Sequence, residues 1–262
     1  MENEHAGYPF VISYETENAT VKYLAAEHTV DIESKTFNKI EIEIKTFAPD
    51  LVIVEGFECG LISEEMFTRV VDRCITSSNK EFFGCPEIFY SVFLAHEKGI
   101  PSMGAELLDN KVFIEYLKVF GYEKEDLLAF YFTRQLPQYF RNNKLHKEED
   151  IPFLLLSYSG EYNWELPDFS YDSYKGWLTK QLGRLPPLSE LTDQSAFCSP
   201  IKEGNNIQRL SYKTGEIRDK YMLHIILASL SNFKKVLVVF GGSHWLVQKE
   251  TLKQHLEKGA EL

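Results

Sequence analysis

The sequence predicts an α/β fold in which a central, mainly parallel sheet is flanked by helices. Two observations lead to this prediction. Residues 51–54 and 236–240 are continuous apolar runs, which are typical of strands buried on both faces. Helix-like stretches alternate with the strand-like runs along the chain, as they do in parallel sheets. With 262 residues, 44% of them apolar, the chain can form one such domain with a large core.

The first predicted unit is strand–helix–strand, over residues 21–54. Residues 21–26 form a short strand-like run. Residues 32–47 fit two patterns, because Ile40, Ile42 and Ile44 alternate with glutamates as in a strand. Four apolar residues spaced three, four and three apart instead form one helical face: Phe37, Ile40, Ile44 and Phe47. We favour the helix, because it completes the unit.

Further elements follow from caps and breakers. The expected elements are a helix from Ser63 to about Ser77, a helix from Pro86 to Gly99, a strand over 100–103, a helix from Asp109 to Gly121, a helix over 123–140, a helix capped by Thr214 and a last strand over 236–240. We expect a single α/β domain over residues 1–262. Residues 141–213 form an irregular insertion or cap segment within it, with one helix over 170–182.

Two histidines each follow a predicted strand. His28 comes three residues after Ala25, and His244 comes three residues after Gly241. In open α/β sheets, ligands bind beyond the carboxyl ends of the strands, and small residues there allow close approach. These histidines are therefore candidate bases or metal ligands. The alternative is that each is a hydrogen-bonded structural residue.

Acidic residues follow other predicted strands and extend the candidate site. Glu55 ends the strand over 51–54, and Glu106 follows the strand over 100–103. Arg218 and Asp219 lie in the helix that precedes the last strand. The structural alternative is that each glutamate is simply the first solvated residue of a loop, and that Arg218 is a solvated surface residue.

These motifs, in this order, resemble the group that contains TraB, Tiki, erythromycin esterase (EreA) and ChaN proteins. The resemblance covers about residues 20–110 and 214–250. Its motifs are Ala25-Ala-Glu-His28, Val52-Ile-Val-Glu55, the stretch from Ala95 to Glu106, Arg218-Asp219-Lys-Tyr-Met222 and Gly241-Gly-Ser-His244. One departure is Ala25, where the group usually has glycine. The resemblance implies an EreA/ChaN-like arrangement of sheet, helices and insertion.

The resemblance implies several chemistries. Tiki-like members resemble metal-dependent peptidases, erythromycin esterases hydrolyse a cyclic ester with His and Glu, and ChaN-like members bind haem. Our leading hypothesis is a hydrolase of ester or peptide bonds, acting on a small molecule or peptide. His28, Glu55 and His244 would activate one water, either directly or through a divalent ion such as manganese, cobalt or zinc that they ligate.

Further residues have expected roles in this hydrolase. Glu87 or Glu106 would serve as an additional ligand or general base. Arg218 would stabilise developing negative charge, and Asp219 would hold Arg218 or a histidine in place. The alternative is a protein that binds a small ligand or haem in the same pocket without turnover. Its support is a set of aromatic residues in the insertion: Tyr158, Tyr162, Trp164, Tyr171, Tyr174 and Trp177.

Composition and missing motifs exclude other classes. The formal net charge of −11 argues against binding of nucleic acid backbones. No secretory signal or membrane-spanning stretch is visible, which predicts a soluble, cytoplasmic protein. The four cysteines form no CxxC pair, so we expect free thiols. Nucleophile-elbow, dinucleotide-binding and Walker motifs are absent. The sequence leaves the oligomeric state open.

Overall fold

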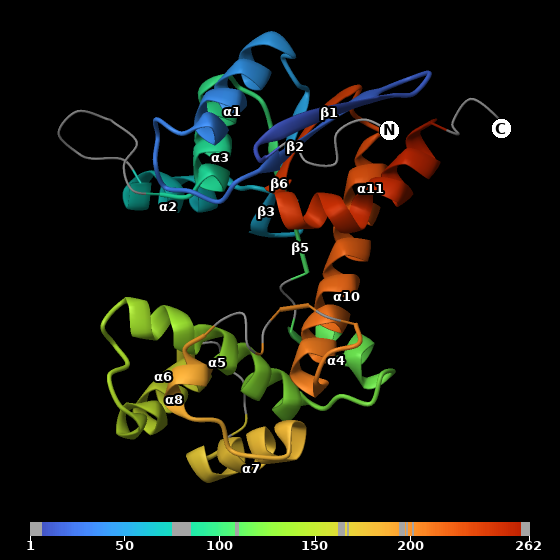
Figure 1. Ribbon diagram of the computed structural model, residues 1–262. Helices are drawn as coiled ribbons and strands as arrows, with labels where there is room; N and C mark the ends of the chain where they lie inside the picture. Colours follow the sequence, from blue (N-terminus) through green and yellow to red (C-terminus); the bar gives the residue numbers. More distant parts are fainter. Residues whose placement is uncertain are drawn as a thin grey trace. The chain divides into compact units, whose positions relative to one another are not determined.

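The computed structural model describes residues 7–74, 85–107, 110–161, 166, 168–193, 197, 199–200 and 202–257 (Figure 1). The chain divides into two compact units. Unit 1 comprises Met1–Leu108 and Arg218–Leu262, and unit 2 comprises Asp109–Ile217. Unit 2 therefore contains the expected insertion at 141–213 and also the helices that precede it.

Unit 1 is built on a mixed sheet, and the α/β prediction is confirmed at this level. The described residues form a six-stranded sheet in the order β1-β2-β6-β3-β5-β4. The strands are β1 (Phe10–Glu15), β2 (Thr20–Ala26), β3 (Leu51–Glu58), β4 (Gly60–Leu61), β5 (Ser102–Glu106) and β6 (Lys235–Gly241). The four inner strands are parallel, whereas β1 and β4 pair antiparallel at the two edges.

The last strand in the chain lies at the centre of the sheet. β6 pairs with β2 on one side and β3 on the other, with Ala26 opposite Gly241 and Val54 opposite Val239. β3 extends beyond the predicted end at Glu55, because its pairing with β5 shifts register between Val54 and Glu58. The carboxyl ends of β2, β6 and β3 therefore meet at one edge.

Helices cover both faces of this sheet (Figure 1). Alternate residues of the parallel strands point to opposite faces. Val52 and Val239 pack with one group of helices, namely α1 (Lys35–Thr46), α2 (Glu64–Cys74) and α3 (Glu87–Glu97). Ile53 and Val238 pack with the opposite group, namely the C-terminal part of α10 (Asn206–Ser229) and α11 (Gly242–Glu257).

Several helix boundaries follow the sequence signals. The ambiguous segment at 32–47 is a helix, α1, and the Ser34 hydroxyl accepts the Phe37 N–H at its start. Ser63 likewise accepts the Met66 N–H at the start of α2. The expected continuation of α2 to Ser77 lies outside the described residues. α3 begins at Glu87, one residue later than predicted, with Pro86 as its N-cap.

Unit 2 is more helical than the sequence indicated. Besides the N-terminal part of α10, its described helices are α4 (Asn110–Lys118), α5 (Lys124–Arg141), η1 (Glu148–Asp150), α6 (Ile151–Glu161), α7 (Tyr171–Leu182) and α8 (Leu188–Leu191). α7 matches the helix expected over 170–182. Thr214 is not a cap, because its hydroxyl donates to the Ser211 carbonyl inside α10. Asp109, predicted to cap a helix, lies outside the described residues.

The expectation of free thiols is wrong for two cysteines. Cys74 at the end of α2 forms a disulfide with Cys85, two residues before α3. Among the described cysteines, Cys59 has a free thiol. Within the described part of the chain, no helix combines the length and apolar character needed to cross a bilayer.

Candidate functional site

The carboxylate of Glu55 lies between two histidines from distant parts of the chain. The distance from His244 Nε2 to Glu55 Oε2 is 3.0 Å, and that from His28 Nε2 to Glu55 Oε1 is 3.7 Å. The Glu55 side chain is 8% exposed. The structure therefore brings together the three residues on which the sequence hypothesis depended.

The strand register accounts for this convergence. Ala26 and Gly241 are paired at the ends of adjacent strands, so His28 and His244 enter the same region. The Gly241 N–H donates to Glu55 Oε1. A Cβ atom at position 241 would lie 2.4 Å from His28 Nε2, so any other residue at this position would displace the His28 ring. Glycine is thus required for the His28 ring to approach this strand end.

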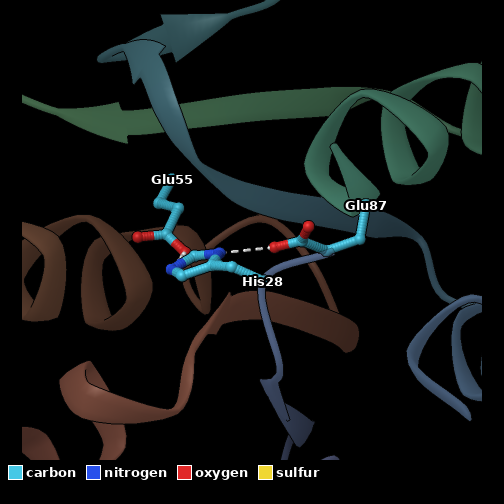
Figure 2. A group of neighbouring side chains, drawn as sticks. All are labelled: His28, Glu55 and Glu87. Atoms are coloured by element: carbon cyan, nitrogen blue, oxygen red, sulfur yellow. Dashed lines mark hydrogen bonds and ion pairs between the residues drawn. The ribbon is translucent and has the colours of Figure 1, made fainter. Parts of the chain in front are cut away.

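Glu87 holds the other side of the His28 ring (Figure 2). His28 Nδ1 lies 2.6 Å from Glu87 Oε1, and the Thr29 N–H donates to Glu87 Oε2 at 3.1 Å. Glu87 is fully buried at the first residue of α3, where the helix dipole favours a carboxylate, whereas the His28 side chain is 62% exposed. The hydrogen bond to Glu87 raises the pKa of His28. His28 is thus an oriented but accessible imidazole.

His244 has a different environment. Its Nδ1 lies 2.7 Å from Asp219 Oδ1, and its Nε2 contacts Glu55, so carboxylates engage both ring nitrogens. Burial opposes the charged imidazolium, but the contacts with Asp219 and Glu55 outweigh burial and raise the pKa of His244 to about 9. Although burial acts to raise it, the pKa of Glu55 is lowered, chiefly by the His244 hydrogen bond. At neutral pH, His244 is therefore a fixed cation and Glu55 an anion.

Arg218 and Glu106 form a second pair at the same edge of the sheet. Arg218 donates from Nε to Glu106 Oε2 at 3.0 Å and from Nη2 to Glu106 Oε1. The N–H of Gly56, the residue after Glu55, also reaches Glu106 Oε1, at 3.5 Å. The pair therefore lies beside Glu55. Asp219 contacts His244, which is one of the two roles expected for it.

The site contains a group that can hold a metal ion. His28, Glu55 and Glu87 each offer a ligand atom, and these atoms lie within 4.8 Å of one another. The set differs from the predicted ligands His28, Glu55 and His244, because both nitrogens of His244 already face carboxylates. One imidazole and two carboxylates suit manganese, cobalt or zinc.

Two further residues contact this network without having been predicted from the sequence. Gln248 donates from Nε2 to Asp219 Oδ1 at 2.7 Å, and the Tyr23 hydroxyl donates to Gln248 Oε1 at 3.2 Å. Gln248 lies four residues after His244, which puts both on one face of α11. That four-residue spacing could have identified Gln248 from the sequence as a neighbour of His244. Tyr23 lies within β2, and its sequence position gave no such signal.

Comparisons of the chain with known protein families, with curated proteins and with solved structures found no match.

Proposed function

We propose that this protein is a hydrolase of ester or peptide bonds that activates water with His28 as general base. One observation carries the proposal. Glu87 fixes Nδ1 of the His28 ring, while Nε2 stands 3.7 Å from the Glu55 carboxylate, beyond a direct hydrogen bond. A buried carboxylate that orients an exposed imidazole is the arrangement of a catalytic base and its supporting group.

The proposed reaction begins with His28 in its neutral form. With Nδ1–H donated to Glu87, Nε2 carries the lone pair and removes a proton from water. The hydroxide oxygen attacks the carbonyl carbon, whose π electrons move to its oxygen. The C–O or C–N bond then breaks, and His28 returns the proton to the leaving group. Glu87 stabilises the transient imidazolium, which is consistent with the raised pKa of His28.

The remaining charged residues have supporting roles in this proposal. Asp219 and His244 hold Glu55 as an anion beside the reacting water. Arg218, whose guanidinium Glu106 fixes through two hydrogen bonds, would stabilise the developing oxyanion. The resemblance to the TraB, Tiki, erythromycin-esterase and ChaN group supports hydrolysis, although that group includes several chemistries.

A divalent ion would bind to His28, Glu55 and Glu87, and it would lower the pKa of a bound water. Metal analysis of protein purified without chelator, followed by titration with manganese, cobalt and zinc, separates this form of the proposal from the metal-free form. Protein that stays empty on titration but hydrolyses substrate excludes the metal-assisted form.

The proposal is tested by assaying a panel of esters and peptides with the protein and its His28→Gln variant. General-base catalysis contributes about 10²- to 10⁴-fold, so we expect a loss of that size in kcat/KM. His255→Gln is the control, because His255 is exposed and its described hydrogen bond is to the Thr251 carbonyl of its own helix. Equal rates in the protein and His28→Gln would exclude the mechanism, and no turnover across the panel would exclude the function.

The competing proposal is a protein that binds haem or another small ligand without turnover. Three of the aromatic residues that favoured this alternative belong to the core of unit 2 and two lie outside the described residues. Tyr158, Tyr174 and Trp177 are buried inside unit 2, whereas Tyr162 and Trp164 lie outside the described residues. Spectroscopic titration with haem, repeated with His28→Ala, tests this alternative. Saturable binding that depends on His28, without hydrolysis, would favour it.

A further inference from the structure

A series of hydrogen-bonded, buried polar side chains extends from His244 into the core of unit 1. The Tyr23 hydroxyl donates to Gln248 Oε1, and Gln248 Nε2 donates to Asp219 Oδ1, the same oxygen that contacts His244 Nδ1. Gln248 and Tyr23 are fully buried, and Asp219 is 5% exposed. The three residues come from α11, β2 and α10, so the chain of contacts joins three elements of unit 1.

The chemistry of these groups fixes the direction of each hydrogen bond. An ionised carboxylate only accepts, so the amide nitrogen of Gln248 must face Asp219. The amide oxygen then requires a donor, which the Tyr23 hydroxyl supplies. Burial, followed by the charges of Asp219 and Glu55, raises the pKa of Tyr23 well above its ordinary value, so the phenol keeps its proton. A flipped amide would leave two buried acceptors facing each other.

Aromatic packing holds Tyr23, the residue of this hydrogen-bonded series that lies farthest from the site. The Tyr23 ring lies edge-on to Phe240, with centroids 5.8 Å apart, and contacts Trp245 at 5.4 Å. Gln248 Nε2 also lies 3.7 Å from Met222 Sδ on α10. The amide therefore has little freedom to rotate away from Asp219.

We propose that Gln248, oriented by Tyr23, is a positioning residue that fixes Asp219 against His244 and thereby fixes Glu55 in the site. The inference rests on the proposed hydrolase function. Gln248 contacts neither His28 nor Glu55 in the described structure, so it acts through Asp219 and His244. An amide suits this position because it donates to a carboxylate at every pH, whereas a carboxyl group donates only while it is protonated.

The test is the near-isosteric variant Gln248→Glu. At low pH the introduced carboxyl is protonated, donates to Asp219 and accepts from Tyr23, so kcat should approach that of the unmodified protein. As pH rises, ionisation of the introduced carboxyl places two carboxylates together. The kcat of the variant should then be about 10- to 100-fold below that of the unmodified protein at the same pH, with little change in KM. Gln181→Glu is the matched control, because the Gln181 amide also donates to a carboxylate, that of Asp126, in unit 2.

A second readout does not depend on activity. The proton between His244 Nδ1 and Asp219 should give a downfield NMR signal, which Gln248→Glu should lose as pH rises and Gln181→Glu should keep. If Gln248→Glu fails to fold, Gln248→Met, which is apolar and similar in size, should fold and lack the signal at every pH. Loss of the signal supports the positioning role even if no substrate is hydrolysed. An unchanged signal, or its absence in the unmodified protein, overturns the proposal.

Discussion

Glu55 contacts two imidazoles that differ in exposure and in hydrogen-bond partners. His244 has both nitrogens engaged by carboxylates and a side chain that is 12% exposed, whereas the His28 side chain is 62% exposed. A buried imidazolium between two carboxylates is a structural cation. The His28 imidazole, with one nitrogen held by Glu87, remains accessible to solvent. The sequence presented the two histidines as equivalent, but their environments make them different.

The His244 contacts predict a specific dependence of stability on pH. The pKa of His244 is about 9 in the folded protein against 6.5 ordinarily, so its ion pairs contribute fully below pH 6.5. That contribution is lost as pH rises to about 9, and its upper limit is about 3 kcal/mol. Urea unfolding from pH 6 to 9.5 should show this decline in the unmodified protein and a smaller one in His244→Gln. Identical slopes in both proteins would contradict the assignment.

The disulfide links the end of α2 to the segment that precedes Glu87 in the site. It joins the end of α2 to Cys85, two residues before Glu87 at the start of α3. The position of Glu87 therefore depends on a covalent link as well as on the packing of α3. This connection was not predictable, because cysteine spacing alone does not define a pairing.

Removing the disulfide should destabilise unit 1. The bridged cysteines are 11 residues apart, and loop-closure entropy for so short a loop corresponds to about 2 to 3 kcal/mol. Cys85→Ser should lower the free energy of unfolding by that amount, as measured by urea denaturation. Cys59→Ser serves as the control, because Cys59 is a free thiol. A reductant should reproduce the effect in the unmodified protein and add nothing to Cys85→Ser.

The elements that the sequence predicted are those with strong local signals. α1 was recognisable because its apolar residues form one helical face and a helix completes a strand–helix–strand unit, and β3 and β6 because they are continuous apolar runs. β1 was missed because it is a mostly half-exposed edge strand whose apolar run is only three residues long. α6 was missed because its apolar residues follow one another without a helical period.

The candidate site was predictable to the extent that strand order brings it together. Strand ends gave His28, Glu55 and His244, because parallel strands end at a common edge. Asp219 was expected to hold Arg218 or a histidine, but neither its choice of His244 nor the pairing of Glu87 with His28 was predictable. Glu87 and Asp219 both lie on helices, and their distance from the strand ends depends on packing that sequence spacing does not encode.

At the scale of the whole molecule, the site residues lie entirely in unit 1, yet they come from both ends of the chain. His28, Glu55, Glu87 and Glu106 belong to the N-terminal part, whereas Arg218, Asp219 and His244 belong to the C-terminal part. Unit 2 lies between these parts in the sequence. The two parts meet through β6, which pairs with both β2 and β3.

Truncation after residue 234 should therefore abolish the folding of unit 1. It removes β6 and α11, and with them the pairing of β2 and β3 to their common neighbour. We expect loss of the cooperative unfolding transition of unit 1, with part of the helical circular dichroism of unit 2 retained. Cooperative unfolding equal to that of the full chain would contradict the central role of β6.

The central place of the last strand also has a consequence for biosynthesis. A ribosome releases β2 and β3 long before it releases Lys235–Gly241, so during that interval neither strand can form the pairing with β6 that it has in the sheet. Exposed strand edges and apolar surface promote association with other nascent chains. The nascent chain thus has a prolonged need for chaperone protection, and a late premature stop codon should yield an aggregating product rather than a folded but less stable protein.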